Sequence, residues 1–117
     1  MVKPAVRTPR RGDVIWLNFT PQAGREQAGR RPAVVMSATN YNAKSGLALV
    51  CPITSHAKGY PFEVPLPSGI PVQGVVLSDH LRSLDWRTRR ALHICKLPTQ
   101  FLAEIIARIV PLLELEE

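Results

Sequence analysis

The chain has 117 residues, 45% hydrophobic and 21% charged, and its fifteen Lys and Arg against nine Asp and Glu give a formal net charge of +6. This length and apolar fraction predict one globular domain over residues 1–117 and exclude wholesale disorder. No run of about 18 apolar residues is present to span a membrane, and the basic N-terminal tail 1–11 lacks the apolar core of a secretory signal. We therefore expect a cytoplasmic protein with no membrane partner.

The positive charge is concentrated in the first hundred residues. Residues 101–117 hold one cation and four acids, so residues 1–100 carry fourteen cations and five acids, a net charge of +9. Eleven of the fifteen cations are arginine, whose planar guanidinium matches phosphate oxygens and stacks on bases. We expect this body to attract polyanions or an acidic protein segment, although net charge also simply favours solubility.

Six short segments rich in β-branched and apolar residues predict strands, separated by glycine and proline turns without intervening helices. They are Asp13 to Phe19, Pro32 to Ser37, Leu47 to Ile53, Phe62 to Leu66, Gly74 to Ser78 and Ala91 to Lys96. Spacing this short predicts a mainly β, antiparallel and partly closed barrel.

The connections between the first three segments carry predictions of their own. Thr20 to Arg31 holds two glycines, a proline and almost no bulky apolar residue, which predicts a long mobile loop. A polar turn is expected around residues 40–46. Because proline lacks the ladder N–H, Pro52 predicts that its strand ends there or runs along a sheet edge.

The C-terminal segment has a helical hydrophobic period. Its apolar residues recur at positions three and four apart: Leu102, Ile105, Ile106, Ile109, Val110 and Leu113. This spacing predicts a C-terminal helix over 99–113. Because Pro111 would remove one intrahelical hydrogen bond, we expect a kink or an end near Val110.

The cysteines and histidines are isolated from one another. Cys51 and Cys95 lie 44 positions apart in apolar runs, which indicates buried reduced thiols. His56, His80 and His93 lack metal-ligand spacing with one another or with the cysteines. We expect no metal site and no cofactor.

Two polar clusters lie beside the second and third predicted strands. They are Arg25, Glu26, Arg30 and Arg31 before the second strand and Thr54, Ser55, His56 and Lys58 after the third. Neighbouring strands of a barrel would bring the clusters together. Cations and hydroxyl donors suit metal-free chemistry on a phosphodiester, where charge on the phosphorus oxygens must be stabilised. A solvated arginine loop is an equally good interpretation of the first cluster.

Four motifs follow one another along the chain: GDVIWLNF (Gly12 to Phe19), EQAGRRPAVVMS (Glu26 to Ser37), CPITSHAKGYPFEV (Cys51 to Val64) and DHLRSLDWR (Asp79 to Arg87). In this order they resemble the motifs of the MazF/PemK family, toxin components of bacterial type II toxin–antitoxin systems. The similarity extends to about Leu113. It implies an SH3-like small antiparallel barrel of the MazF/PemK/CcdB-like kind with a C-terminal helix, which forms a homodimer.

The resemblance also implies an activity. The family members are ribosome-independent mRNA interferases, which cut single-stranded RNA at a short preferred sequence. The family's catalytic arginine and threonine fall on Arg31 and Thr54, and Glu26 matches a glutamate that assists RNA handling or catalysis. A guanidinium is a poor general base, so Arg31 suits charge stabilisation or proton donation to the leaving oxygen. Glu26 is then the nearby carboxylate for the 2′-proton, and His56 competes for that role.

Further side chains are candidates for RNA contact: Asn18, Phe19, Gln27, Arg30, Ser55, Lys58, Tyr60, Arg82 and Arg87. Aromatic rings, including those of Trp16 and Trp86, can stack on bases, but on an alternating strand core packing is the favoured interpretation for Trp16 and Phe19. The arginines near Arg87 fit phosphate binding, a solvated turn or a surface for an acidic tail. Asn18 and Arg30 replace an aspartate and a histidine of many relatives. The RNA sequence that a relative cuts therefore does not predict the sequence that this chain cuts.

Two other function classes stay open. One is a non-catalytic toxin of the same fold that inhibits a DNA topoisomerase, and the other is a generic nucleic-acid-binding barrel. Arg31 and Thr54 favour the enzyme, because neither alternative requires them. The implied protein partner is a MazE-like antitoxin whose acidic tail competes with RNA for the positive groove.

Overall fold

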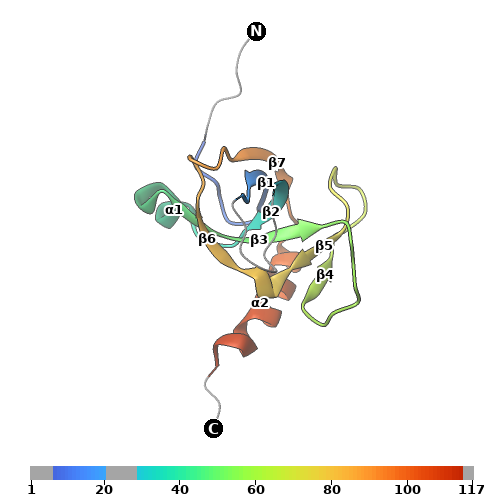
Figure 1. The fold of residues 1–117 in the computed structure, drawn as a ribbon. Helices are drawn as coiled ribbons and strands as arrows, with labels where there is room; N and C mark the ends of the chain where they lie inside the picture. Colours follow the sequence, from blue (N-terminus) through green and yellow to red (C-terminus); the bar gives the residue numbers. More distant parts are fainter. Residues whose placement is uncertain (1–6, 21–28, 115–117) are drawn as a thin grey trace.

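The structure, a computed structural model, describes residues 7–20 and 29–114 (Figure 1). Glu26, Gln27 and most of the predicted loop therefore lie outside the described residues. The described strands are β1 (Asp13–Asn18), β2 (Arg30–Val35), β3 (Leu47–Thr54), β4 (Glu63–Pro65), β5 (Val75–Leu77), β6 (Arg82–Asp85) and β7 (Leu92–Lys96). The helices are α1 (Thr39–Ser45), the short 3-10 helix η1 (Ser78–His80) and α2 (Thr99–Leu113).

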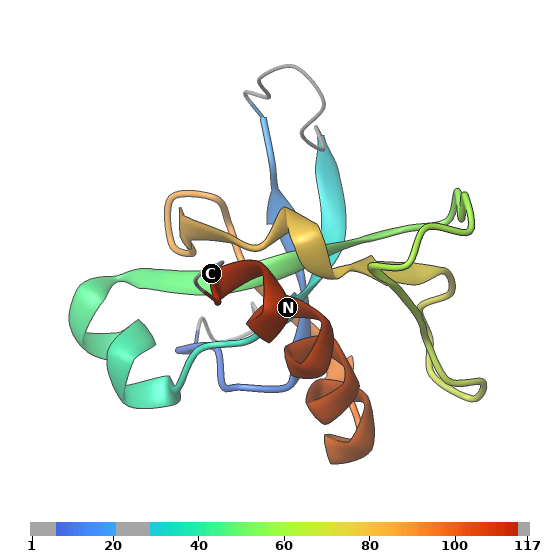
Figure 2. The same cartoon turned by 90° about the horizontal axis from the view of Figure 1, so that it is seen from below.

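All strand pairings of the described residues are antiparallel, and β3 is the strand that connects them. The order is β4-β5-β3-β2-β1-β7, and β6 pairs with the first half of β3. Helix α2 packs against one side of the curved sheet (Figure 2). The predicted mainly antiparallel barrel with a C-terminal helix is confirmed.

The curved sheet has two apolar clusters, one on each face. One packs beneath α2 and includes Val14, Val34, Cys51 and Ile105. The other fills the inside of the curve: Ile15, Leu17, Phe19, Ala33, Val35, Ala48, Val50, Leu84 and Trp86. Because successive side chains alternate between faces, β1 contributes to both clusters.

The prediction for Pro52 is wrong, because β3 is an interior strand that continues to Thr54. Pro52 lies opposite Ala33 of β2. On its other side, β6 pairs only with residues 47–50 and β5 only with residues 53–54. The missing N–H of Pro52 therefore lies in the gap between two partner strands, where no ladder bond is lost.

Helix α1, the short helix η1 and strand β6 were not predicted from the sequence. The expected polar turn is helix α1, whose sequence TNYNAKS is polar and whose only buried residue is Asn42. Asn42 Nδ2 donates hydrogen bonds to the carbonyls of Pro9 (2.8 Å) and Ser37 (3.1 Å), so tertiary contacts stabilise a helix of weak propensity. Strand β6 has one buried apolar residue, Leu84, and no alternating pattern; its pairing with β3 makes it a strand.

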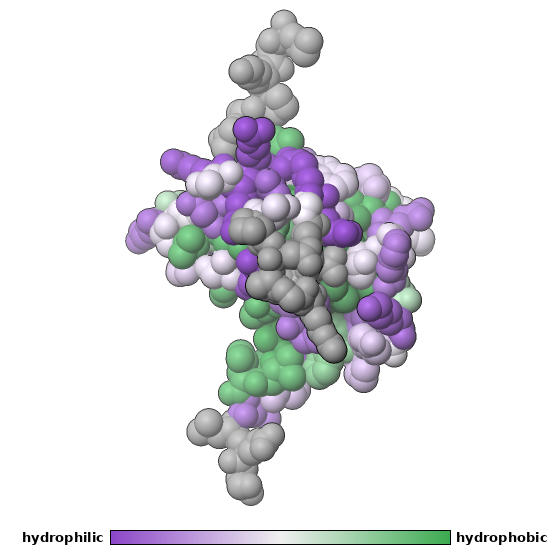
Figure 3. Space-filling view, in the orientation of Figure 1, coloured by the Kyte–Doolittle hydropathy of each residue, from purple (hydrophilic) through white to green (hydrophobic). Residues whose placement is uncertain are grey.

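Helix α2 runs over Thr99–Leu113 without ending at Val110. Pro111 lies in the last turn, so the helix does not end near Val110, and the alternative of a kink there stays a prediction. The inner face buries Leu102, Ile105 and Ile109. Ile106, Val110, Leu112 and Leu113 are exposed, and Figure 3 shows an apolar surface towards the C-terminal end. No described helix is both long and apolar enough to cross a membrane.

Both cysteines are free thiols. Cys51 is fully buried, and burial, with a smaller contribution from the charge of Asp79, raises its pKa to about 12. Cys95 is only half-buried, although burial is also the main cause that raises its pKa. The expectation of buried thiols therefore holds for Cys51 alone.

Candidate functional site

Arg31 and Thr54 come from neighbouring strands and lie across from each other. The β2–β3 register places Ala33 opposite Pro52 and Val34 opposite Cys51, so its continuation places Arg31 opposite Thr54. Side-chain alternation puts both residues on the face that carries Ala33. The apolar cluster inside the barrel therefore ends at a half-buried guanidinium and a hydroxyl.

These two residues line one cavity of about 860 Å³, which we call the Arg31–Thr54 groove. Its remaining walls come from the segment after β3, β4, β5 and η1: His56, Lys58, Tyr60, Glu63, Leu77, Asp79 and His80. The structure thus brings together the predicted residues Arg31, Thr54, Lys58 and Tyr60. The prediction that the two polar clusters meet is confirmed in this groove for Arg31 of the first cluster and for Thr54, His56 and Lys58 of the second.

The backbone two residues further along the chain orients the Thr54 hydroxyl. Thr54 Oγ1 accepts a hydrogen bond from the backbone N–H of His56 at 3.1 Å, which leaves the hydroxyl proton available for donation. Gly74 packs against this position: a Cβ built on Gly74 would lie 2.1 Å from the Thr54 carbonyl oxygen. Gly74 also has a φ of +124°, so only glycine permits this approach.

A second basic cavity of about 1140 Å³, the Arg30–Arg87 hollow, opens beside the β6–β7 turn. It gathers the predicted residues Asn18, Arg30 and Arg87. Arg30 Nη2 donates to the Arg90 carbonyl at 2.9 Å, which ties β2 to the turn. Arg87 lies over the Trp86 ring, 4.9 Å from its centroid. This hollow therefore offers guanidinium groups that are held in place by the protein.

A smaller cavity of about 320 Å³ is lined by both Arg30 and Arg31, so it shares one lining residue with each of the two larger sites. Ser55 and Trp16 also line it. Trp16 is 39% exposed, so the expectation of core packing is wrong for this residue. On the same face of β1, Val14 belongs to the apolar cluster that packs against α2, but Trp16 does not.

Phe19 and Trp86 do not face the solvent. The Phe19 ring is fully buried inside the barrel, and Arg82 covers it at 5.9 Å from the ring centroid. Trp86 is also buried and donates its indole N–H to the Asn42 carbonyl at 2.9 Å. Neither ring can stack on a base, so the expected base contact of Phe19 is corrected to a core role. Arg82 is half-buried above that ring.

Sequence reasoning did not select Glu63, Asp79 or His80, all of which line the Arg31–Thr54 groove. Asp79 and His80 lie on η1, a short helix that no pattern in the sequence predicts. Glu63 opens β4, and its carboxylate accepts backbone hydrogen bonds from Lys58 and Gly59. The one sequence signal for Glu63 is that it is the only acidic residue of the motif KGYPFEV.

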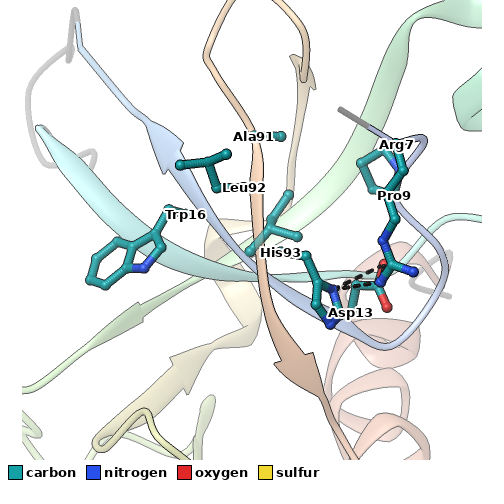
Figure 4. A pocket seen from close by; sticks show the side chains of 8 residues that line it. Arg7, Pro9, Asp13, Trp16, Ala91, Leu92 and His93 are labelled. Atoms are coloured by element: carbon teal, nitrogen blue, oxygen red, sulfur yellow. Dashed lines mark hydrogen bonds and ion pairs between the residues drawn. The ribbon is translucent and has the colours of Figure 1, made fainter. Parts of the chain in front are cut away.

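A separate pocket of about 260 Å³ lies at β7, lined by Arg7, Asp13, Trp16, Leu92 and His93 (Figure 4). Arg7 Nη2 lies 2.7 Å from His93 Nδ1 and 3.5 Å from the buried Asp13 carboxylate. The Arg10 N–H also donates to this carboxylate at 2.9 Å. These contacts hold the segment before β1 against β7. Neither Arg31 nor Thr54 lines this pocket.

The described residues offer no group of three or more His, Cys, Asp or Glu side chains that could hold a metal ion. The Arg31–Thr54 groove instead combines a guanidinium, a hydroxyl, two imidazoles and two carboxylates. Such a set can stabilise negative charge and transfer protons.

Comparisons with known proteins identify the family of the chain. The model of the family described as PemK-like, MazF-like toxin of type II toxin–antitoxin system matches residues 10–113. The chain belongs to this toxin family. A curated relative, the endoribonuclease toxin MazF of Escherichia coli K12, is 53% identical over 83 residues, which is 71% of this chain and 74% of that protein.

Solved structures of MazF resemble the whole described fold. MazF from Deinococcus radiodurans superimposes with a TM-score of 0.90 at 56% identity, covering 92% of this chain and 98% of that one. A MazE–MazF structure from the same organism gives a TM-score of 0.85 at 54% identity, covering 95% and 100%. The Arg31–Thr54 groove therefore lies in a chain with the fold of MazF.

Proposed function

We infer that this chain is an endoribonuclease toxin of a type II toxin–antitoxin system, and we propose that it cuts single-stranded mRNA in the Arg31–Thr54 groove without a metal. Its curated relatives are named endoribonucleases, among them MazF at 53% and PemK at 31% identity. No topoisomerase inhibitor is among these names, so that alternative is not favoured. The observation that carries the proposal is the meeting of Arg31 and Thr54 in one groove.

The proposed reaction is attack by the ribose 2′-oxygen on the adjacent phosphorus. The O2′–P bond forms while the P–O5′ bond breaks, which leaves a 2′,3′-cyclic phosphate and a 5′-hydroxyl. Arg31 stabilises the charge that develops on the nonbridging oxygens, and the Thr54 hydroxyl donates to one of them. Two protons move: one leaves the 2′-hydroxyl, and one reaches the 5′-oxygen.

Several groups are placed for these proton transfers. His56, Asp79 and His80 line the groove with Arg31 and Thr54. Glu26, the carboxylate expected to take the 2′-proton, lies outside the described residues, so its role stays a prediction. Variants of Glu26 and His56, compared over pH, identify the group that accepts the proton.

RNA is proposed to continue from the Arg31–Thr54 groove past Trp16 to the Arg30–Arg87 hollow. The smaller cavity shares Arg31 with the Arg31–Thr54 groove and Arg30 with the Arg30–Arg87 hollow, so a phosphate backbone on this path would meet guanidinium groups. Exposed Trp16 and Tyr60 offer faces for base stacking. Lys58, Ser55, Asn18 and Arg87 keep their proposed role in RNA contact, and Gln27 lies outside the described residues.

The test is cleavage of a long single-stranded RNA in EDTA, with the fragment ends mapped chemically. We expect cutting to persist and to leave a 2′,3′-cyclic phosphate and a 5′-hydroxyl. A substrate with a 2′-deoxy sugar at the cut site should bind and survive. Loss of cutting in EDTA, or efficient cutting of the deoxy substrate, would contradict the mechanism.

We further propose that the toxin is a homodimer. Four large apolar side chains of α2, at Ile106, Val110, Leu112 and Leu113, are 42%, 44%, 49% and 73% exposed. Several exposed large apolar side chains on one helix favour self-association. Light scattering should give twice the mass of one chain, and Val110→Asp should reduce it. An unchanged single-chain mass for the native protein would contradict the homodimer.

The proposed protein partner is a MazE-like antitoxin with an acidic tail. Structures of MazE–MazF complexes from Deinococcus radiodurans are similar to this chain over almost its whole length. The net charge of +9 on residues 1–100 favours an acidic segment that competes with RNA. Deleting the antitoxin tail should abolish inhibition, and raising the salt concentration should slow association. Equal inhibition without the tail would contradict competition for the groove.

A further inference from the structure

The carboxylate of Glu63 holds the backbone of the segment that follows β3. Glu63 is buried, with 9% of its surface exposed, and is the first residue of β4. Its Oε2 and Oε1 accept the N–H of Lys58 at 3.0 and 3.2 Å, and Oε1 also accepts the N–H of Gly59 at 2.9 Å. The Glu63 N–H donates to the Tyr60 carbonyl at 3.1 Å, which closes the turn.

The backbone N–H groups of Lys58 and Gly59 form a small anion-binding concavity. Gly59 has a φ of +79°, the left-handed conformation that lets successive backbone N–H groups point to one side. In a groove that attracts phosphates, such a concavity would suit an oxygen of the RNA backbone. Here the protein's own carboxylate fills it. Removing a carboxylate from water costs free energy, and the charge-assisted hydrogen bonds offset that cost.

The segment held in this way carries groove-lining side chains. Residues 55–60 are all exposed and belong to no strand or helix, so few contacts fix their position. Lys58 and Tyr60 nevertheless line the Arg31–Thr54 groove. At the other end, the segment is fastened by the bond from the His56 N–H to Thr54 Oγ1. The Glu63 carboxylate therefore determines where Lys58 and Tyr60 stand relative to Arg31.

We propose that Glu63 is a positioning residue for RNA binding: its carboxylate fixes residues 58–60 so that Lys58 and Tyr60 meet the substrate at the rim of the groove. The inference rests on the proposed function. Glu63 acts through the segment and contributes to binding in the ground state and the transition state alike. Its loss therefore raises KM and leaves kcat nearly unchanged.

The experiment measures kcat and KM for a short RNA with Glu63→Ala, Glu63→Gln, Lys58→Ala and the Glu63→Ala/Lys58→Ala double variant. We expect Glu63→Ala to raise KM about tenfold, with Glu63→Gln intermediate because its amide oxygen still accepts. The double variant should bind no worse than the weaker-binding single variant. Fully additive losses, or a fall in kcat with KM unchanged, would overturn the proposal.

Two controls separate this role from folding. Glu104→Ala removes an exposed carboxylate on α2 that pairs with Arg108, and it should leave KM unchanged. Gly59→Ala leaves Glu63 intact but strains the concavity, since no atom lies within 4 Å of the added Cβ and only the φ of +79° opposes it. Gly59→Ala should raise KM as Glu63→Ala does. An unchanged KM for Gly59→Ala in a folded protein would overturn the proposal.

Binding of the 2′-deoxy RNA distinguishes failure of this proposal from failure of the proposed function. The dissociation constant of that uncleaved RNA reports on Glu63 without any catalysis. A weaker affinity of Glu63→Ala supports the positioning role even if the cleavage chemistry is reassigned. An affinity equal to that of the native protein overturns it, while the roles of Arg31 and Thr54 stand.

Discussion

Arg31 and Thr54 lie across from each other on adjacent strands, although 22 residues separate them in the sequence, because the β2–β3 register that pairs Ala33 with Pro52 continues to both. The two functional groups are thus held by rigid strands at the point where the interior apolar cluster ends. A site built on strands fixes the guanidinium and the hydroxyl before RNA arrives. That preorganisation is what electrostatic stabilisation of a transition state requires.

Thr54→Val replaces the hydroxyl by a methyl group of similar shape. We expect the cleavage rate to fall at least about tenfold, because one donor to the phosphorus oxygens is lost. Thr54→Ser keeps the hydroxyl and should keep most of the rate. Single-turnover cleavage is the measurement, with Thr39→Val on α1 as a control of the same chemistry outside the groove. Equal rates for Thr54→Val and the native toxin would remove Thr54 from catalysis.

Gly74→Ala should damage the site through the backbone. The new Cβ would stand 2.1 Å from the Thr54 carbonyl oxygen and 2.9 Å from its carbonyl carbon, so β3 or β5 has to move. We expect the free energy of unfolding to fall by about 1–3 kcal/mol and cleavage to fall with it. Gly69→Ala is the matched control, because its φ is +88° but no atom lies within 4 Å. Equal denaturation midpoints for the two variants would contradict the close approach.

Asp85 should make the β6–β7 turn sensitive to acid. The backbone N–H of Thr88 (2.9 Å), assisted by that of Arg87 (3.1 Å), donates to its carboxylate and lowers the pKa of Asp85. A lowered pKa in the folded state adds stability above the unfolded pKa of about 3.9, and this stability is lost as the pH falls through the folded value.

Asp85→Asn keeps an acceptor for the turn but does not titrate. Thermal unfolding of the native toxin and of this variant, followed from about pH 6 to about pH 2, measures the difference. The advantage of the native toxin over Asp85→Asn should shrink as the pH falls. A difference in melting temperature that stays constant over this range would show that the Asp85 carboxylate does not support the turn.

Local sequence patterns predicted those strands and helices whose apolar residues recur at a regular spacing. Alternation on β1 identified Ile15, Leu17 and Phe19 as one face, and the spacing of apolar residues identified α2. The resemblance to the family identified Arg31 and Thr54, and the strand order explains their meeting.

Features that depend on tertiary contacts were not predictable in the same way. The exposure of Trp16 depends on how far α2 reaches over β1, and helix α1 depends on the hydrogen bonds of Asn42. The place of Glu63 in the groove depends on backbone groups of the preceding segment, which leave no pattern in the sequence. These contacts form only once the chain has folded, and they follow no periodic spacing along the sequence.

Single-turnover cleavage by Arg31→Ala and Arg31→Lys tests the central claim most directly. Both variants should keep the circular dichroism spectrum of the native toxin, because Arg31 lies at the end of the interior cluster. We predict that Arg31→Ala slows cleavage at least about tenfold to a hundredfold, and that Arg31→Lys is also slow because an ammonium group does not reproduce the two-pronged guanidinium. Cleavage by folded Arg31→Ala at the native rate would contradict the assignment of the Arg31–Thr54 groove as the active site.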